Sequence, residues 1–189
     1  GPVYPYKGGI AHYTGLMCKA LSKNNDVYMM SYSMQYPRIL FKKEQKDFGN
    51  DTFKIDNTDF AINTANPFNW IKMANKIKKI APDLVIIQWW HPYFAPCYFI
   101  LQKCLGKCKK LMVCHNVFPH ERFPLDRFLT GLCLRGMDYY LVQFNTDDFT
   151  STKEHLNLKE PNYQGFIYTM DDVILFGADE DYFYLRELN

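Results

Sequence analysis

The residues LMVCHNVFPHE place His115, Asn116, His120 and Glu121 directly after the apolar run Leu111–Cys114. That run has the length of one buried strand, and ligands of open α/β sheets bind beyond the carboxyl ends of parallel strands. A histidine there can donate to a sugar hydroxyl, orient a phosphate or act as a base. The alternative is that these side chains cap neighbouring carbonyl groups.

A glycine pair, Gly8-Gly9, precedes a predicted helix and could expose backbone N–H groups to a phosphate or carboxylate. An ordinary tight turn is an equally good interpretation. The loop lacks Gly-x-Gly-x-x-Gly, and no acidic residue ends a strand ~20 residues later, so it is no dinucleotide fingerprint. His12 lies one turn into the helix and off its apolar stripe, a position that by itself is typical of a polar surface residue.

A second strand end carries Trp89, Trp90 and His91. Two tryptophans in a core strand usually serve packing, whereas His91 at the carboxyl edge could face a ligand or be structural. Three histidines at two strand ends, with a glycine loop at the same edge, favour function. We expect the glycine turn and the imidazole of His115 to meet at the rim of one hollow.

Several kinds of chemistry are not indicated. There is no Gly-x-Ser-x-Gly and no His-Glu-x-x-His, and His120-Glu121 lacks a third ligand, so no metal site is expected. The six cysteines follow no disulfide or zinc spacing and are predicted to be reduced thiols, which favours the cytosol. Cys18, Cys114 and Cys133 are expected to be core residues.

The net charge of +2 is too small to indicate a nucleic-acid partner. The lysines are clustered, however, and residues 171–181 near the end of the chain are acidic. The lysine clusters are explained by helix faces exposed to solvent, and contact with anionic lipid is the alternative. No apolar run approaches the ~20 residues that cross a bilayer. The two clusters are Lys72, Lys76, Lys78 and Lys79, and Lys103, Lys107, Lys109 and Lys110.

Strands and helices that alternate along the chain predict an α/β fold with a doubly wound, mostly parallel sheet and helices on both faces. The helices are expected at 10–23, 67–80, 94–105, 125–135 and, more weakly, 147–156. The strands are expected at 26–32, 84–90, 111–114, 138–142 and 173–176, with a short one near 52–55.

Four motifs occur in order: GPVYPYKGGIAHYT at the start, SMQYP at 33–37, IIQWWHPYFAPCY at 86–98 and CHNVFPHE at 114–121. Together they resemble the amino-terminal domain of family 4 glycosyltransferases, from Gly1 to about Thr150. The resemblance implies half of a GT-B fold, in which two Rossmann-like domains face one another across a cleft. It also implies retaining transfer of a sugar from a nucleotide-sugar donor to a glycan or lipid-linked acceptor, without metal or cofactor.

In that family the glycine-rich loop approaches the donor's diphosphate and the acceptor, and a histidine at the position of His115 lies beside the transferred sugar. The resemblance therefore makes His115 the catalytic candidate. His91, His120 and Glu121 match recurrent positions that we assign to the acceptor side. The substrate-binding candidates are Lys7, Gly8, Gly9, His12, His91, Asn116, His120 and Glu121.

The family pattern also contains a central strand that would precede Gly1, and a carboxyl-terminal domain with paired glutamates that holds most of the nucleotide. We expect residues 1–158 to form the Rossmann-like acceptor-side domain. Residues 159–189 would be an irregular tail or the start of a truncated second domain, for which DDVILFG at 171–177 is the candidate strand. The chain alone is then expected to be inactive. Its expected location is cytoplasmic, with peripheral attachment at the inner membrane face as a further hypothesis.

Two other interpretations stay open. The same cleft could belong to a non-catalytic sugar- or phosphate-binding module. Another GT-B enzyme, such as a sugar epimerase, would require more acid/base carboxylates near the cleft than the sequence offers.

Overall fold

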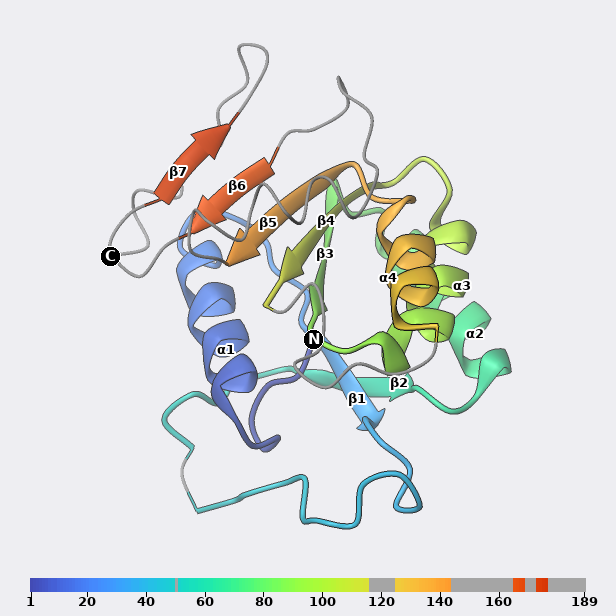
Figure 1. Cartoon of the computed structure of the whole chain (residues 1–189). Helices are drawn as coiled ribbons and strands as arrows, with labels where there is room; N and C mark the ends of the chain where they lie inside the picture. The colour runs from blue at the N-terminus through green and yellow to red at the C-terminus, as the bar shows by residue number, and fades with distance from the viewer. Residues whose placement is uncertain (50, 116–124, 144–164, 169–172, 177–189) are drawn as a thin grey trace. The chain divides into compact units, whose positions relative to one another are not determined.

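The structure, a computed structural model, describes residues 1–49, 51–115, 125–143, 165–168 and 173–176. The protein is a mixed α/β protein with parallel sheets and helices (Figure 1). The chain divides into two compact units, Gly1–Met73 and the residues from Ala74 onward. Each unit is described by itself below. Among the described residues, no helix combines the length and apolar character needed to cross a membrane.

The first unit contains α1 (Gly9–Leu21) and a parallel pair of strands, β1 (Met30–Met34) and β2 (Asp59–Asn63). The helix was expected at this place, and its buried side includes Ala11, Thr14 and Cys18. The first strand begins four residues later than predicted. For the long polar stretch from Gln35 to about Asn66 the sequence predicted no firm structure beyond a short possible strand, and this stretch contains β2.

The short strand expected at 52–55 is wrong, because this segment packs on α1 and pairs with no strand. Lys19 Nζ donates to the carbonyl of Thr52 at 2.8 Å. The carbonyl oxygen of Phe53 lies so close to Gly15 that a Cβ there would be 2.9 Å from it. A left-handed residue, Asn57 with φ 58°, then turns the chain into β2.

The second unit is built on a five-stranded sheet in the order β3-β4-β5-β6-β7 (Figure 1). Neighbouring strands are parallel except β6 and β7, which are antiparallel. The strands are β3 (Leu84–Trp89), β4 (Lys109–Cys114), β5 (Tyr139–Gln143), β6 (Gly165–Tyr168) and β7 (Val173–Phe176). The parallel pairing of β3, β4 and β5 confirms the expected parallel character of the sheet.

Helices precede or connect the first three strands of this sheet. α2 (Pro67–Ile80) runs from the first unit into the second and ends before β3. The short 3₁₀ helix η1 (Pro92–Phe94) and α3 (Ala95–Leu105) connect β3 to β4, and α4 (Asp126–Leu134) precedes β5. α3 and α4 pack against each other, and both lie on the same face of the sheet (Figure 1).

The sequence predictions for this unit are mostly confirmed, with differences at the ends of elements. β4 begins at Lys109, two residues earlier than expected, and β6 was not predicted. The strand expected at 173–176 is present as β7. The helix expected at 147–156 and the domain boundary expected after residue 158 lie outside the described residues.

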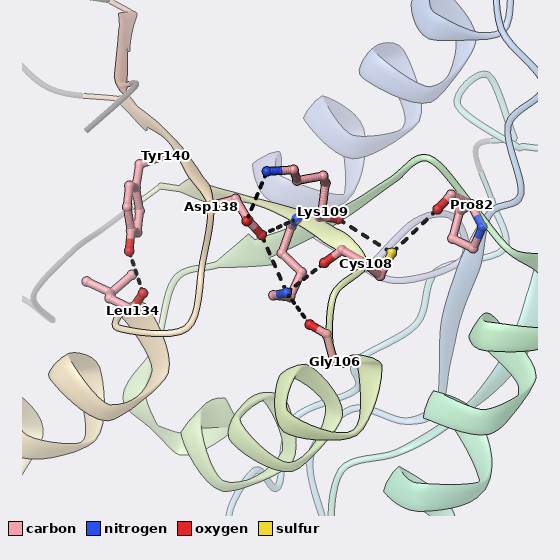
Figure 2. A network of polar contacts seen from close by, with 8 residues as sticks. Pro82, Gly106, Cys108, Lys109, Leu134, Asp138 and Tyr140 are labelled. Atoms are coloured by element: carbon pink, nitrogen blue, oxygen red, sulfur yellow. Dashed lines mark hydrogen bonds and ion pairs between the residues drawn. The ribbon is translucent and has the colours of Figure 1, made fainter. Parts of the chain in front are cut away.

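A polar network holds the amino-terminal ends of β4 and β5 together (Figure 2). The buried ammonium of Lys110 donates to the carbonyls of Gly106 at 3.0 Å and Cys108 at 2.6 Å, and lies 3.4 Å from Asp138 Oδ2. The backbone of Lys110 takes part as well, since its N–H donates to the carboxylate oxygen Oδ2 of Asp138 and its carbonyl accepts the N–H of Asp138, both at 2.9 Å. The network is at the opposite end of the strands from His115.

Candidate functional site

His115 follows the last residue of β4, at the carboxyl edge of the sheet as predicted. Its N–H donates to the carbonyl of Trp89 at 2.8 Å, which continues the pairing of β4 with β3 by one residue. Its ring is half-buried, and Nε2 lies 2.7 Å from Oε1 of Gln88. The backbone and the ring of His115 are therefore both fixed to β3.

The ring of His115 faces an amide oxygen, which only accepts hydrogen bonds. With a hydrogen on Nε2, the imidazole therefore donates to Gln88. Since Gln88 is 2% exposed and held within β3, it can orient the ring, as buried hydrogen-bond partners orient functional histidines elsewhere.

Gln88 is a residue that the sequence analysis missed, because it was treated only as an interruption of an apolar strand. The available signal was its polarity. A buried amide in a strand covered on both faces needs a hydrogen-bond partner, and the residue after the neighbouring strand was a candidate.

His91 also lies at a strand end, but its ring is turned toward its own backbone. Nδ1 accepts the N–H of Tyr93 at 3.1 Å and so caps η1. Burial lowers the pKa of His91 below its ordinary value of 6.5. The neutral ring with an accepting Nδ1 fits this capping role, and a part in substrate binding stays a prediction.

The glycine turn is at the start of α1. Gly8 is the residue before the helix, with φ 105° and ψ 163°, a conformation essentially restricted to glycine. Among the described residues, no side chain caps this helix end by a hydrogen bond. Lys7, Gly8 and Gly9 are exposed, and within the described part of the chain no atom beyond their own neighbours and helix backbone lies within 4 Å of where a Cβ of either glycine would be. The turn can thus present N–H groups to an anion at close range.

His12, one turn further on, is exposed and stacks on the ring of Phe53, with ring centroids 4.4 Å apart and an angle of 23° between the planes. The contact joins α1 to the segment that was expected to form a strand. It accounts for His12 as a packing residue on the surface, and its predicted contact with substrate stays untested.

The remaining candidates, Asn116, His120 and Glu121, lie outside the described residues. The glycine turn and His12 belong to the first unit, whereas His91 and His115 belong to the second. The meeting of the glycine turn and His115 at one rim therefore stays a prediction.

The first unit contains a surface hollow of about 750 Å³ that the sequence analysis did not indicate. Its aromatic lining includes Tyr4, Phe48 and Phe60, and its basic lining includes Lys46 and Lys54. None of the predicted site residues that the structure describes lines this hollow. Most of the hollow comes from residues 46–60, within the stretch whose structure the sequence left open.

Four of the six cysteines are buried. Cys18, Cys114 and Cys133 are buried, as expected for core residues, and all six cysteines are free thiols. Burial raises the pKa of Cys97 and of Cys114 to about 12. In the part of the chain that the structure describes, no three His, Cys, Asp or Glu side chains are grouped so that they could hold a metal ion.

Comparison of the chain with protein-family models, with curated protein sequences and with solved structures gave no match. The functional assignment therefore rests on the geometry above and on the sequence motifs.

Proposed function

We propose that the chain is the acceptor-side, Rossmann-like half of a retaining GT-B glycosyltransferase. The reaction would transfer a sugar from a nucleotide-sugar donor to a glycan or lipid-linked acceptor. His115 is the residue that contacts the transferred sugar. The other substrate-binding candidates keep the roles expected from the resemblance.

The observation that carries the proposal is the arrangement of His115. It lies at the carboxyl end of a parallel strand, where ligands of α/β sheets bind, and its Nε2 is 2.7 Å from the amide oxygen of the buried Gln88. An imidazole oriented in advance can hydrogen-bond a sugar hydroxyl without first losing rotamer freedom.

The glycine turn supports the proposal from the other unit. A leaving nucleoside diphosphate gains negative charge, and N–H groups at a helix start can stabilise it. The uncapped start of α1 and the open space beside Gly8 and Gly9 suit the approach of such a group. Side chains at these two positions would occupy that space.

The resemblance also predicts a further strand in the sheet. β1 lies in a two-stranded sheet and β3 is the outer strand of the five-stranded sheet. Each therefore has a backbone edge that could pair with one more strand. The proposal further requires a second Rossmann-like domain to bind most of the nucleotide.

The test uses the full-length protein with a panel of nucleotide-sugar donors, and measures nucleotide release and sugar transfer. His115→Ala should lower transfer by about 100-fold, the effect of removing one hydrogen bond that acts in a transition state. The control is Arg135→Ala, which changes an exposed side chain at the end of α4 that is not a site candidate, and it should retain activity within a few fold. Wild-type rates for His115→Ala across the panel would show that the assigned role is wrong.

The transfer assay, together with binding measured by calorimetry, separates the enzyme from a non-catalytic binding module. A module would bind nucleotide sugar or phosphate in calorimetry, lose that binding in Gly9→Ala, and show no turnover with any donor. An epimerase would convert the donor sugar without acceptor.

The proposed location is cytoplasmic, with peripheral contact between the lysine-rich α2 and an acidic membrane. Three of its lysines, Lys72, Lys78 and Lys79, are exposed. Replacing these three lysines by glutamine should weaken sedimentation with anionic vesicles at low salt, and unchanged sedimentation would remove the hypothesis.

A further inference from the structure

The loop after β1 carries three consecutive apolar side chains at the surface. Ile39 is 86% exposed, Leu40 62% and Phe41 40%. Single apolar side chains at a protein surface are ordinary, but a contiguous exposed group indicates an interaction site. We call residues 38–43, with sequence RILFKK, the basic-apolar tip.

The tip has a defined backbone. The N–H groups of Leu40 and Phe41 both donate to the carbonyl of Pro37, at 3.0 and 3.1 Å, which makes one tight turn. The side chain of Gln45 holds the base of this loop, since it bonds both the N–H and the carbonyl of Tyr36, at 3.1 and 2.9 Å. The apolar residues are therefore presented by a closed loop with hydrogen bonds at its base.

Basic residues lie on both sides of the apolar group. Arg38 precedes it, Lys42 and Lys43 follow it, and all three are exposed. Glu44 is the one acidic residue between positions 38 and 46. The partner surface must consequently be negative around a centre that accepts apolar side chains.

We propose that the basic-apolar tip anchors the protein to an anionic lipid bilayer. Ile39 and Leu40 enter the boundary between headgroups and acyl chains, and the basic side chains pair with lipid phosphates. A bilayer combines a negative surface with an apolar layer directly beneath it. This combination matches a tip in which basic side chains flank an exposed apolar group. This contact is separate from the lysines of α2 and does not depend on the proposed transfer reaction.

The experiment measures co-sedimentation of the chain with vesicles of equal parts phosphatidylglycerol and phosphatidylcholine in 50 mM NaCl, and with phosphatidylcholine alone. The variants are Ile39→Ser/Leu40→Ser and Arg38→Gln/Lys42→Gln/Lys43→Gln. Phe128→Ser is the matched control, because Phe128 is 64% exposed on α4, close to the value for Leu40. Circular dichroism of each variant checks that the fold is kept.

The wild type should bind anionic vesicles and lose binding as salt shortens the range of the charges. The double serine variant should partition about 30-fold more weakly, because two aliphatic side chains no longer leave water. The triple glutamine variant should partition about 100-fold more weakly, at about fivefold per charge. Binding within twofold of wild type in either tip variant would overturn the proposal. So would absence of wild-type binding, equal binding to phosphatidylcholine alone, or an equal loss in Phe128→Ser.

Discussion

The network at the start of β4 and β5 allows a sharp test of how burial sets the strength of an ion pair. Asp138 is 30% exposed and interacts with two adjacent lysines, Lys109 at 3.6 Å and Lys110 at 3.4 Å (Figure 2). The two distances are nearly equal, but the Lys109 side chain is 58% exposed and that of Lys110 only 7%. Lys110 also satisfies the carbonyls of Gly106 and Cys108.

Lys110→Met keeps the aliphatic volume and removes the charge. The variant removes the donor to two carbonyl groups, and each carbonyl that water does not reach lowers the free energy of unfolding by about 1–3 kcal/mol. It also breaks a largely buried ion pair. We expect a loss of at least about 2 kcal/mol in the free energy of unfolding. Lys109→Met removes an exposed pair and should cost under about 0.5 kcal/mol.

Urea unfolding followed by tryptophan fluorescence and circular dichroism measures both values. A loss of 2 kcal/mol lowers the midpoint by roughly 1 M for a slope of about 2 kcal/mol per M. Double variants with Asp138→Ala then give the coupling energy of each pair, which should be above about 1 kcal/mol for Lys110 and near zero for Lys109. Equal losses in the two methionine variants would refute the reasoning from burial.

Three further outcomes follow from the backbone and from His91, each measured as the free energy of unfolding in urea. Gly8→Ala should cost about 1–3 kcal/mol because φ is 105°, although space is open there. Gly9→Ala should be neutral or stabilise by up to about 1 kcal/mol. A larger loss in Gly9→Ala than in Gly8→Ala would contradict the assigned helix start. Gly15→Ala should cost about 1–3 kcal/mol, because its Cβ would lie 2.9 Å from the carbonyl oxygen of Phe53, and an unchanged midpoint would show that this contact is looser. Burial holds the pKa of His91 in the folded protein below 6.5, so as pH falls His91 is protonated in the unfolded chain before it is protonated in the folded protein. The free energy of unfolding should therefore decrease as pH drops below 6.5. His91→Asn does not titrate and should show a shallower fall, so equal pH profiles would exclude His91 as a cause.

Elements with a strong local signal could be predicted from the sequence. α2 runs from Pro67 to Ile80 as expected, because proline suits a first turn and the apolar stripe has helical spacing. The apolar runs of β3 and β4 marked buried parallel strands. In contrast, β2 is short and pairs with β1, a strand far away in the sequence, so tertiary pairing defines it and no local pattern does.

The basic-apolar tip shows a second limit. Ile39, Leu40 and Phe41 were part of a stretch whose structure the sequence left open. Whether an apolar residue in a loop is buried depends on what the loop packs against. The three residues are exposed because the turn at Pro37 closes within the loop, and spacing along the chain does not contain that information.

His91 and His115 had the same signal in the sequence, a histidine directly after an apolar strand, yet they differ in the structure. His91 precedes a proline, which favours the extended backbone found there, φ −154° and ψ 133°, and its ring caps the N–H of Tyr93. The backbone N–H of His115 extends the hydrogen bonding between β4 and β3 by one residue, and the buried amide of Gln88 on β3 contacts its ring. Position at the end of a strand therefore does not by itself define a functional histidine. The second requirement is a partner that orients the ring, and for His115 this partner is Gln88, whose alignment with β4 follows only from the parallel register.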